Sequence, residues 1–504
     1  MLRPPVNRGL RVLDRSLFKA TFPLASATVF ESKNISRIKN ELMKSKDIMH
    51  APGIMAVKAV QDIRDKEADL KRKCVLLRQE VKVDDKSTWS PTIRQLVEAK
   101  DVDIRPYLLE LDYDHWTYHD IMQSILPEDM GIEIPTGYSQ VGHVAHFNLR
   151  DEHLPYRHII GQVLIDKQAS ITTVINKVEE VGLHSKYRTF AYEVLAGDGN
   201  MNVVHKEQGC EFAFDFSKVY WNTRLSTEHE RLVGIFKEGE AVCDVMAGVG
   251  PFALPAGKKR VFVWANDINP HGYEMMKRGA VRNKVDQFVK AFNMDGRDFI
   301  PWATKELYTR PPKTVKMQGD EVIRDPRPGS PNRMSEADKR QKRPDKQKKN
   351  QPIVTYTSPR TFDHYVMNLP ATAIEFLPAF IGVYAGQEHL FEPHTDRKLP
   401  LIHVYCFSTN SDDCVAEIKD ICERLTEQLG YPFRPEDCKH EDEETKAEGS
   451  NEKTGESQSS TSEQPSGRNE ELELQISSVR LVAPSKRMFR ATFRLPKEIA
   501  FKKN

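Results

Sequence analysis

Short apolar runs alternate with helix-length amphipathic stretches in the second half of the chain. Strands are predicted in four such runs, at residues 241–245, 260–265, 364–367 and 401–406. Helical periodicity between them, as in 273–283 and 413–429, predicts helices that cover a sheet. This alternation predicts an α/β, doubly wound and mainly parallel sheet whose ligands bind at the carboxyl ends of the strands. The last apolar segments, near 475–496, are expected to add an antiparallel hairpin.

The first half of the chain has a different pattern. Helical periodicity and short apolar runs such as 74–77 predict a small basic α/β domain over 36–110. A second α/β domain is predicted over 111–215, where segments rich in Thr, Val and Ile indicate strands around helices. The segments expected to be strands are 142–149, 161–165 and 172–175.

Two stretches of the large domain at 216–500 are too polar to form a core. Residues 310–355 are rich in Pro, Lys and Arg, and residues 436–470 are rich in Glu, Ser and Gly. Both are expected to be disordered insertions. The basic run 339–343 would suit RNA contact or a nuclear address, although a solvated loop is the favoured interpretation.

Composition excludes some classes of protein. The 504 residues are 39% hydrophobic and 29% charged, and no apolar run has the length of a membrane-spanning helix, so no membrane partner is expected. The seven cysteines form no CxxC pair, which argues against a zinc site or a disulfide framework. The net charge of +1 conceals segments of opposite charge: residues 1–110 have an excess of basic residues, and residues 436–470 are acidic.

The N-terminal segment suggests targeting. Basic residues recur among apolar and hydroxyl residues of the first thirty positions, where Asp14 is the only acid. This composition is typical of a mitochondrial transit peptide, which we place at 1–35; a disordered basic terminus is the alternative. The basic positions are Arg3, Arg8, Arg11, Arg15 and Lys19.

A glycine-rich turn follows the first strand of the large domain. Gly248 and Gly250 would let the backbone approach a ligand, and Asp267, at the end of the next strand, could bind ribose hydroxyls. The third glycine of a dinucleotide fingerprint is missing. Asp244 suits an ammonium group better than a pyrophosphate. Together these features favour a methyl donor over a dinucleotide.

Polar residues also follow the third and fourth strands. Asp295 could bind an adenine amino group beside Gly296, or could simply precede a helix. Asn368 begins an Asn-Leu-Pro-Ala loop that would face the pocket, unless the loop is a turn without catalytic meaning. Ala371 cannot stack on a base, which favours a ring nitrogen over an exocyclic amine as the methyl acceptor.

Several ordered motifs resemble those of the eukaryotic and archaeal tRNA (guanine-37, N1)-methyltransferase family, over most of residues 110–500. They are Tyr-Arg-Thr at 187–189, Leu-Ala-Gly at 195–197, Glu-Gln-Gly at 207–209, and the segments 220–232, 244–252, 266–271 and 367–370. The resemblance implies a class I (Rossmann-like) methyltransferase domain with a parallel sheet and a C-terminal antiparallel hairpin, preceded by two smaller α/β domains.

The resemblance also implies an activity: methyl transfer from S-adenosyl-L-methionine to N1 of guanosine 37 in tRNA, which supports reading-frame maintenance. Glu228 would accept the N1 proton, Arg188 would stabilise charge on O6, and Asn368 would hold the guanine edge. Without the resemblance, the ordinary interpretations are favoured: Glu228 would cap a helix, and Arg188 would form a surface ion pair.

Cofactor contacts are implied for His229, Asp267, Ile268, Asp295, Gly296 and Asn368, with no metal. Residues 36–110 would contact the tRNA body while the anticodon stem-loop enters the site, and a monomer in the mitochondrial matrix, nucleus and cytoplasm is expected. Two alternatives remain open at this stage: an aminocarboxypropyl transferase acting on a modified tRNA guanine, and a catalytically silent tRNA-binding protein.

Overall fold

The computed structural model describes residues 2–61, 72–128, 131, 133–178, 187, 189–323, 352–411, 413–439 and 469–503. The chain divides into two compact units. The first consists of Met1–Val178 and Tyr192–Asn200, and the second of Glu179–Ala191 and Met201–Asn504.

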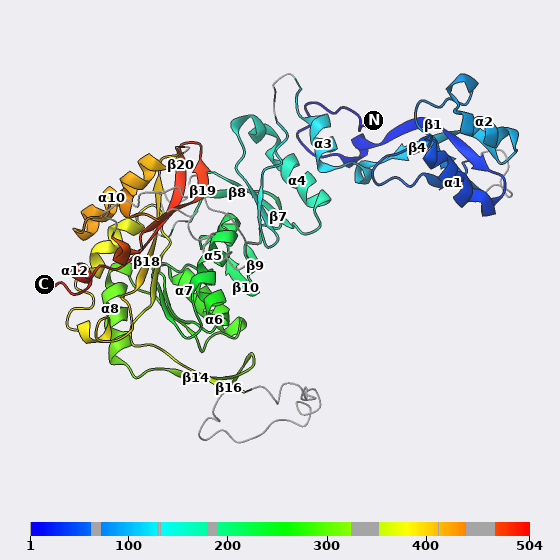
Figure 1. The fold of residues 1–504 in the computed structure, drawn as a ribbon. Coiled ribbons are helices and arrows are strands. Elements are labelled where there is room, and N and C mark those ends of the chain that lie inside the picture. Colours follow the sequence, from blue (N-terminus) through cyan, green and yellow to red (C-terminus); the bar gives the residue numbers. More distant parts are fainter. Residues whose placement is uncertain are drawn as a thin grey trace, which may run out of the picture. The chain divides into compact units, whose positions relative to one another are not determined.

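An antiparallel sheet of strand order β2-β3-β1-β4 opens the first unit (Figure 1). Its elements are β1 (Ala20–Val29), α1 (Ile35–Lys44), β2 (Val57–Ala59), β3 (Lys73–Leu76), α2 (Pro91–Glu98) and β4 (Val102–Leu111). Strand β1 pairs with β4 along its whole length, and its last six residues are buried. This strand lies within residues 1–35, so a cleavage at the end of the expected transit peptide would remove it from the sheet.

A mixed sheet of order β5-β6-β7-β8 completes the first unit. Its elements are α3 (Tyr118–Ile125), β5 (Ser139–Val141), β6 (Val144–Phe147), α4 (Arg157–Lys167), β7 (Thr173–Lys177) and β8 (Tyr192–Gly197). The prediction of a strand at 161–165 is wrong, because these residues belong to α4. Ile160, Val163 and Leu164 share the buried face of that helix, and five apolar residues alone do not distinguish a buried helix from a strand.

The second unit is built on a seven-stranded sheet of order β13-β12-β11-β17-β18-β20-β19. Its strands are β11 (Ala241–Asp244), β12 (Phe262–Asn266), β13 (Val289–Phe292), β17 (His364–Met367), β18 (Leu401–Ser408), β19 (Gln475–Ala483) and β20 (Lys486–Arg494). The first five in spatial order are parallel, and β20 and β19 continue the sheet antiparallel. The predicted doubly wound sheet with its C-terminal hairpin is confirmed.

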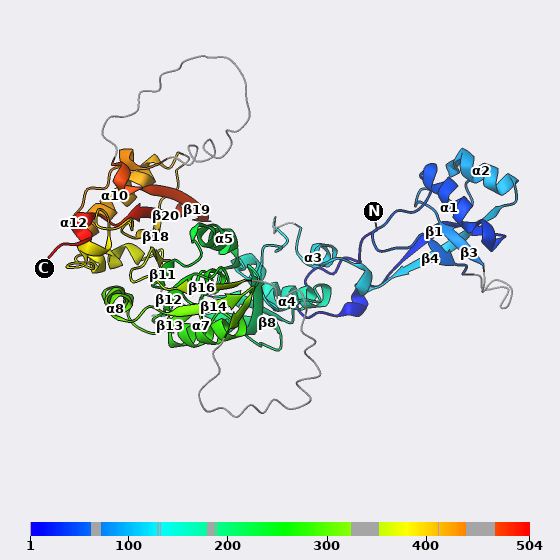
Figure 2. The same ribbon diagram turned by 60° about the horizontal axis from the view of Figure 1, so that its bottom comes forward.

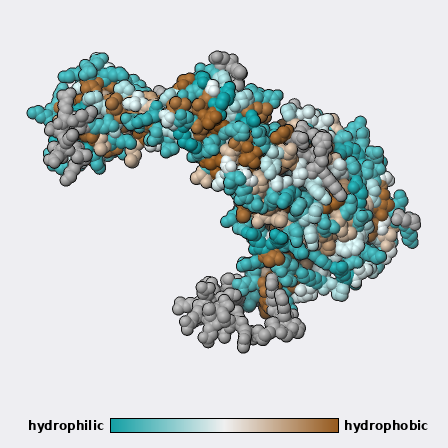
Figure 3. All heavy atoms as spheres, turned by 180° about the vertical axis from the view of Figure 1, so that it is seen from behind, coloured by the Kyte–Doolittle hydropathy of each residue, from teal (hydrophilic) through white to brown (hydrophobic). Residues whose placement is uncertain are grey.

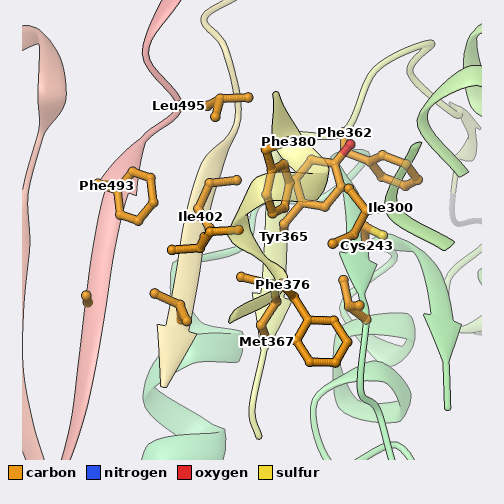
Figure 4. Packing of buried hydrophobic residues seen from close by; sticks show 14 of the residues in the cluster. Cys243, Ile300, Phe362, Tyr365, Met367, Phe376, Phe380, Ile402, Phe493 and Leu495 are labelled. Carbon is orange, nitrogen blue, oxygen red and sulfur yellow. The ribbon is translucent and has the colours of Figure 1, made fainter. Parts of the chain in front are cut away.

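Helices cover both faces of this sheet. Figure 1 shows α6 and α7 on one face and α8 and α10 on the other. The helices are α5 (Ser226–Ile235), α6 (Ala253–Lys258), α7 (Pro270–Arg282), α8 (Gly296–Thr309), α10 (Val415–Leu429) and α12 (Lys497–Ala500). Every residue of β11 and β17 is buried, as expected for central parallel strands. Side chains of β11, β17, β18 and β20 pack there against Ile300 of α8 and against Phe376 and Phe380 (Figure 4).

A small antiparallel sheet of order β15-β14-β16 projects from this unit in Figure 1, and its strands β14 and β16 overlap the large sheet in the view of Figure 2. It comprises β14 (Thr314–Gln318), β15 (Glu321–Ile323) and β16 (Ile353–Thr357), so the expectation of disorder throughout 310–355 is wrong at both ends of that stretch. The buried side chains of Val315 and Met317 alternate with exposed neighbours and give the segment an apolar face. Residues 324–351, and 440–468 of the other expected insertion, lie outside the described residues.

The second unit also contains the hairpin of β9 (Asn202–Glu207) and β10 (Cys210–Asp215), which sequence analysis assigned to the domain before it. Hydrophilic side chains cover much of the face in Figure 3, with hydrophobic ones in smaller patches. No helix in the described part of the chain is long and apolar enough to cross a membrane.

Candidate active site

A cavity lies at the carboxyl ends of the parallel strands, with about 1050 Å³ of empty space including the part open to solvent. This is the place at which a doubly wound sheet binds its ligands. The walls come from the loops after β11, β12, β13 and β17, from the segment before α5, and from α5 itself. The lining residues are Tyr187, Val219, Tyr220, Trp221, Asn222, Leu225, His229, Val245, Met246, Ala247, Gly248, Val249, Pro251, Phe252, Asn266, Asp267, Ile268, Asn269, Gly272, Asp295, Gly296, Asn368, Leu369 and Phe376.

The glycine-rich turn and Asp267 form one hydrogen-bonded unit. The backbone N–H of Gly248 donates to Oδ2 of Asp267 at 2.7 Å, and the N–H of Asn269 donates to Oδ1 at 2.8 Å. Burial raises the pKa of Asp267, against the lowering effect of these two bonds. A carboxylate has about four acceptor positions, so each oxygen retains capacity for a ribose hydroxyl.

The two glycines of the turn have different roles. Gly248 has φ +59°, lines the cavity, and would direct a Cβ into open space. Gly250 has φ +90° but does not line the cavity; its Cβ would lie 3.1 Å from Leu254 and 3.2 Å from Met276. The expectation that the backbone approaches a ligand closely therefore fits Gly248. Gly250 instead allows the turn to pack against α6 and α7.

Gly248→Ala is expected to weaken binding of S-adenosylhomocysteine at least about tenfold, or roughly 1.4 kcal/mol. The added methyl group would enter the cavity, and the left-handed backbone costs a non-glycine residue about 1–2 kcal/mol. Isothermal titration calorimetry measures the affinity. Gly234→Ala in α5 is the control, because its Cβ also meets nothing within 4 Å but its backbone is helical. Wild-type affinity in Gly248→Ala would contradict this placement of the turn.

Asn266 is a structural residue of the site that sequence analysis missed. Its Nδ2 donates to the carbonyls of Val245 and Met294, each at 3.0 Å, and its Oδ1 accepts the N–H of Met294 at 2.9 Å. The side chain therefore joins the loops after three neighbouring strands. Its place beside Asp267, immediately after an apolar strand, was the available signal.

Asp295 and Asn368 lie where the sequence placed them. Asp295 lines the cavity and also caps α8, since its Oδ1 accepts the N–H of Arg297 at 2.8 Å. Both interpretations of this residue are therefore compatible with its position. Asn368 follows β17 and lines the cavity, as do Ile268 and Gly296 after their own strands.

Asp244 does not line this cavity, and its expected contact with an ammonium group stays a prediction. Its carboxyl group is fully buried at the end of β11, and neither oxygen has a hydrogen-bonding side-chain or backbone partner that satisfies both distance and angle among the described residues. Burial raises the pKa of Asp244 well above its ordinary value, and the nearby Asp267 raises it further.

Glu228 is buried within a cluster of side chains from α5, β18 and β20. It accepts hydrogen bonds from Arg231 Nε at 2.7 Å, from the hydroxyl of Tyr405 at 2.6 Å, and from Arg490 at 3.1 Å. Burial alone would raise the pKa of Glu228, but these partners lower it overall. The carboxylate is thus an ion-pair partner, not a cap of its own helix, and it does not line the cavity wall.

Arg188 lies outside the described residues, whereas its neighbour Tyr187 lines the cavity. His229 lines it as well. The aromatic and amide side chains that precede α5 also line the cavity and were not predicted as site residues, although their segment carries one of the family motifs. They are Tyr220, Trp221 and Asn222.

The residues present fit S-adenosylmethionine. Asp267 offers acceptors to a ribose, Gly248 leaves space beside the turn, and the buried Nε1 of Trp221 has no hydrogen-bond partner among the described residues. Asp295 and Gly296 would lie next to the adenine. The fold and this cavity define a class I S-adenosylmethionine-dependent methyltransferase.

Comparison with known proteins identifies the family. Residues 203–309 match the TRM5/TYW2 methyltransferase domain, and residues 118–200 match the TYW2 N-terminal domain. The tRNA (guanine(37)-N(1))-methyltransferase of Aspergillus fumigatus is 52% identical over 503 residues, covering 100% of this chain and 96% of the relative. That of Schizosaccharomyces pombe is 40% identical over 98% of this chain and 96% of its own length. The chain belongs to the tRNA (guanine(37)-N(1))-methyltransferase family.

A solved structure shares the fold. The chain aligns with that of the complex of aTrm5 and tRNALeu at a TM-score of 0.50 and 16% identity, covering 94% of this chain and 100% of that one. The fold class predicted from sequence is therefore confirmed by a known structure as well as by the sheet order.

Proposed function

We propose that this protein transfers a methyl group from S-adenosyl-L-methionine to N1 of guanosine 37 in tRNA. The observation that carries the proposal is the position of Asn368, which lines both the cofactor cavity and a second cavity beside it. Family membership supports the choice of substrate, because relatives that match the full chain are named for this reaction.

The second cavity has the size and lining for a nucleic-acid base. It contains about 450 Å³ of empty space, including the part open to solvent. Tyr220, Asn222, Leu225 and Asn368 line both cavities. The remaining lining residues are Pro370, Phe407, Arg480, Val482 and Met488. Aromatic, apolar and cationic side chains together suit a base that has left its stack.

Guanine N1 carries a proton and no free lone pair, so methylation requires a base. When bound, S-adenosylmethionine supplies an electrophilic methyl carbon on a sulfonium sulfur, which would leave as the thioether of S-adenosylhomocysteine. Glu228 would receive the N1 proton, Asn368 would hold the guanine edge, and Arg188 would stabilise negative charge on O6.

Glu228 needs a free oxygen to act as a base, and Arg231 is the partner best placed to release one. The Arg231 side chain is 36% exposed, whereas that of Arg490 is 4% exposed. Hydrogen bonds of catalytic groups often reach their working geometry only with substrate present. We therefore expect Arg231 to change partners when tRNA binds.

The reaction is tested with purified protein and cofactor labelled in the methyl group. Unmodified tRNA with guanosine at position 37 should become labelled, and the same tRNA with adenosine there should not. Cofactor labelled in the aminocarboxypropyl group tests the rival transferase. Equal labelling of both tRNAs, or label from the aminocarboxypropyl group, would refute the proposal; absence of any transfer would favour a silent binding protein.

Phe407→Ala is expected to lower kcat/KM for tRNA about 5- to 150-fold, because stacking of a base on an aromatic ring contributes about 1–3 kcal/mol. Affinity for S-adenosylhomocysteine should remain unchanged, since Phe407 lines only the second cavity. Phe407→Tyr keeps the ring and is the control. An equal loss in both variants would show that the ring does not stack on the substrate.

Partner and location follow as further proposals. The basic excess of residues 1–110 supports phosphate contacts with the tRNA body, and a monomer in the mitochondrial matrix, nucleus and cytoplasm is proposed. Deletion of residues 1–35 would remove β1, so Arg3→Gln with Arg11→Gln is the milder test of targeting. Loss of mitochondrial fluorescence from a fusion carrying this double variant is the expected result.

A further inference from the structure

Arg480 of β19 brings a positive charge to the wall of the second cavity. The other described residues that line this cavity have aromatic, apolar or amide side chains, and none of them is acidic. Arg480 does not line the cofactor cavity. Its guanidinium group is therefore placed to meet the substrate and not the methyl donor.

A row of side chains across three neighbouring strands holds Arg480 at this wall. Strands β18, β20 and β19 lie side by side at one end of the large sheet (Figure 1). Phe407 of β18 and Arg480 of β19 both pair with Met488 of β20, so the three side chains lie on one face of the sheet. All three line the second cavity. A base that stacks on Phe407 would thus lie beside a guanidinium group.

An irregularity in the pairing of β19 with β20 determines that an arginine occupies this row. Ser478 pairs with Phe489 and Arg480 pairs with Met488, so β19 has one extra residue, Val479, at this point. In a regular ladder Val479 would pair with Met488 and take the place of Arg480. Such β-bulges are frequent next to active sites, where they redirect a side chain. Here the bulge replaces an apolar side chain of the row with a cationic one.

Arg480 has no acidic partner among the described residues. Its guanidinium group donates to Oδ1 of Asn222 at 3.4 Å and to the carbonyl of Leu481 at 3.3 Å, and both acceptors are neutral. Partial burial and the positive charge of nearby Arg224 lower the pKa of Arg480. Because a partly buried cation without a carboxylate is poorly compensated, binding of an anion would stabilise it.

The backbone phosphates are the anions that a tRNA substrate brings to this cavity. Guanine is uncharged when it enters, whereas each linkage of the RNA backbone carries a negative charge. A nucleotide whose base fills the second cavity has its own 5′-phosphate within the reach of a long side chain on that wall. Arginine suits this group, since its planar fork donates two parallel hydrogen bonds to a phosphate.

We propose that Arg480 binds the 5′-phosphate of the nucleotide whose base enters the second cavity, and so holds that nucleotide out of its stack. The inference deepens the proposed function and rests on it, because it names a second part of the substrate that this cavity recognises. Arg480 binds the substrate in this proposal and takes no part in proton transfer.

A thermodynamic cycle with the full chain and two tRNAs tests the inference. One tRNA has the ordinary phosphate 5′ of guanosine 37, and the other has an uncharged methylphosphonate at that linkage alone. For the wild type, the uncharged linkage should lower kcat/KM for methylation at least about tenfold. Arg480→Met should lower kcat/KM for the ordinary tRNA by a similar factor. This variant should use the two tRNAs within about twofold of each other, because the contact is already lost.

Arg487→Met is the matched control. It removes the same charge from the same hairpin, but Arg487 donates to Sγ of Cys414 and does not line the second cavity. This variant should therefore keep the wild-type preference for the charged linkage. Affinity for S-adenosylhomocysteine should be unchanged in both variants, since neither residue lines the cofactor cavity.

Two results would overturn the inference while leaving the proposed function intact. In the first, Arg480→Met keeps the preference for the charged linkage, so that Arg480 does not contact this phosphate. In the second, Arg480→Met loses as much affinity for S-adenosylhomocysteine as activity on tRNA, so that Arg480 only supports Asn222, which lines both cavities. If the wild type does not methylate guanosine 37 of the ordinary tRNA, the proposed function itself fails, and the inference with it.

Discussion

Glu228→Gln is expected to lower the single-turnover rate of tRNA methylation about 10²- to 10⁴-fold, the usual contribution of a general base. Gln can still accept hydrogen bonds from Tyr405 and Arg490, which bond to Glu228 in the wild type, but it cannot take the proton of guanine N1. Rapid-quench measurement with saturating enzyme and labelled cofactor gives this rate without a contribution from product release.

Binding of S-adenosylhomocysteine separates this catalytic effect from a collapse of the site. Glu228 does not line the cofactor cavity, so the affinity of the variant should stay within about threefold of wild type. A single-turnover rate close to that of the wild type would remove Glu228 from the reaction and leave it as a structural anion.

Arg490→Met should have the largest effect on stability, about 3 kcal/mol in the free energy of unfolding, which is the lower end of the cost of breaking a buried ion pair. Arg490 reaches both Glu228 and Ser477 from β20, and its side chain is 4% exposed. The lower end applies because Arg231 and Tyr405 still bond to Glu228. Urea unfolding monitored across pH checks the value.

The pH dependence has a definite sign. The pKa of Glu228 is lowered in the folded protein, so its stabilisation is complete above the ordinary Glu pKa of about 4.3 and is lost as pH falls through the lowered value. Arg490→Met raises that folded pKa, so its deficit should be largest near neutral pH and shrink below about pH 4. Arg494→Met on the same strand is the control, with an expected cost of about 1 kcal/mol because its partner Glu473 is more exposed. A pH-independent deficit would show that Arg490 contributes packing alone.

The sheet of the second unit was predictable because strands that are buried on both faces consist of uninterrupted runs of apolar residues. The run at 364–367 coincides with β17, and 401–406 lies within β18. The same logic failed at 161–165, where a helix buried on one side leaves a similarly short run. Strand β14 was not predicted, because the overall composition of 310–355 is polar. The alternation of the apolar residues Val315 and Met317 with polar neighbours is confined to a few positions of that stretch.

The cavity-lining residues that follow the strands were predictable for a geometric reason: the carboxyl ends of parallel strands meet at one edge. Asp267, Asp295 and Asn368 all reach the same cavity. Asp244 also lies at a strand end but is buried and does not line the cavity, and a sequence position alone does not reveal this difference. The partners of Glu228 come from positions 405 and 490, and the contact of Glu207 with His229 joins two elements. These contacts could not be predicted from the sequence, because only the folded chain brings such distant residues together.

The chain crosses between its two units three times, after residues 178, 191 and 200. A truncated chain that begins at residue 201 would lack Tyr187, which lines the cofactor cavity. One that begins at residue 179 would carry β8 without β7, its partner in the first unit, and would expose the buried Leu195. A single cut in the chain therefore cannot separate the two units without removing residues from one of them.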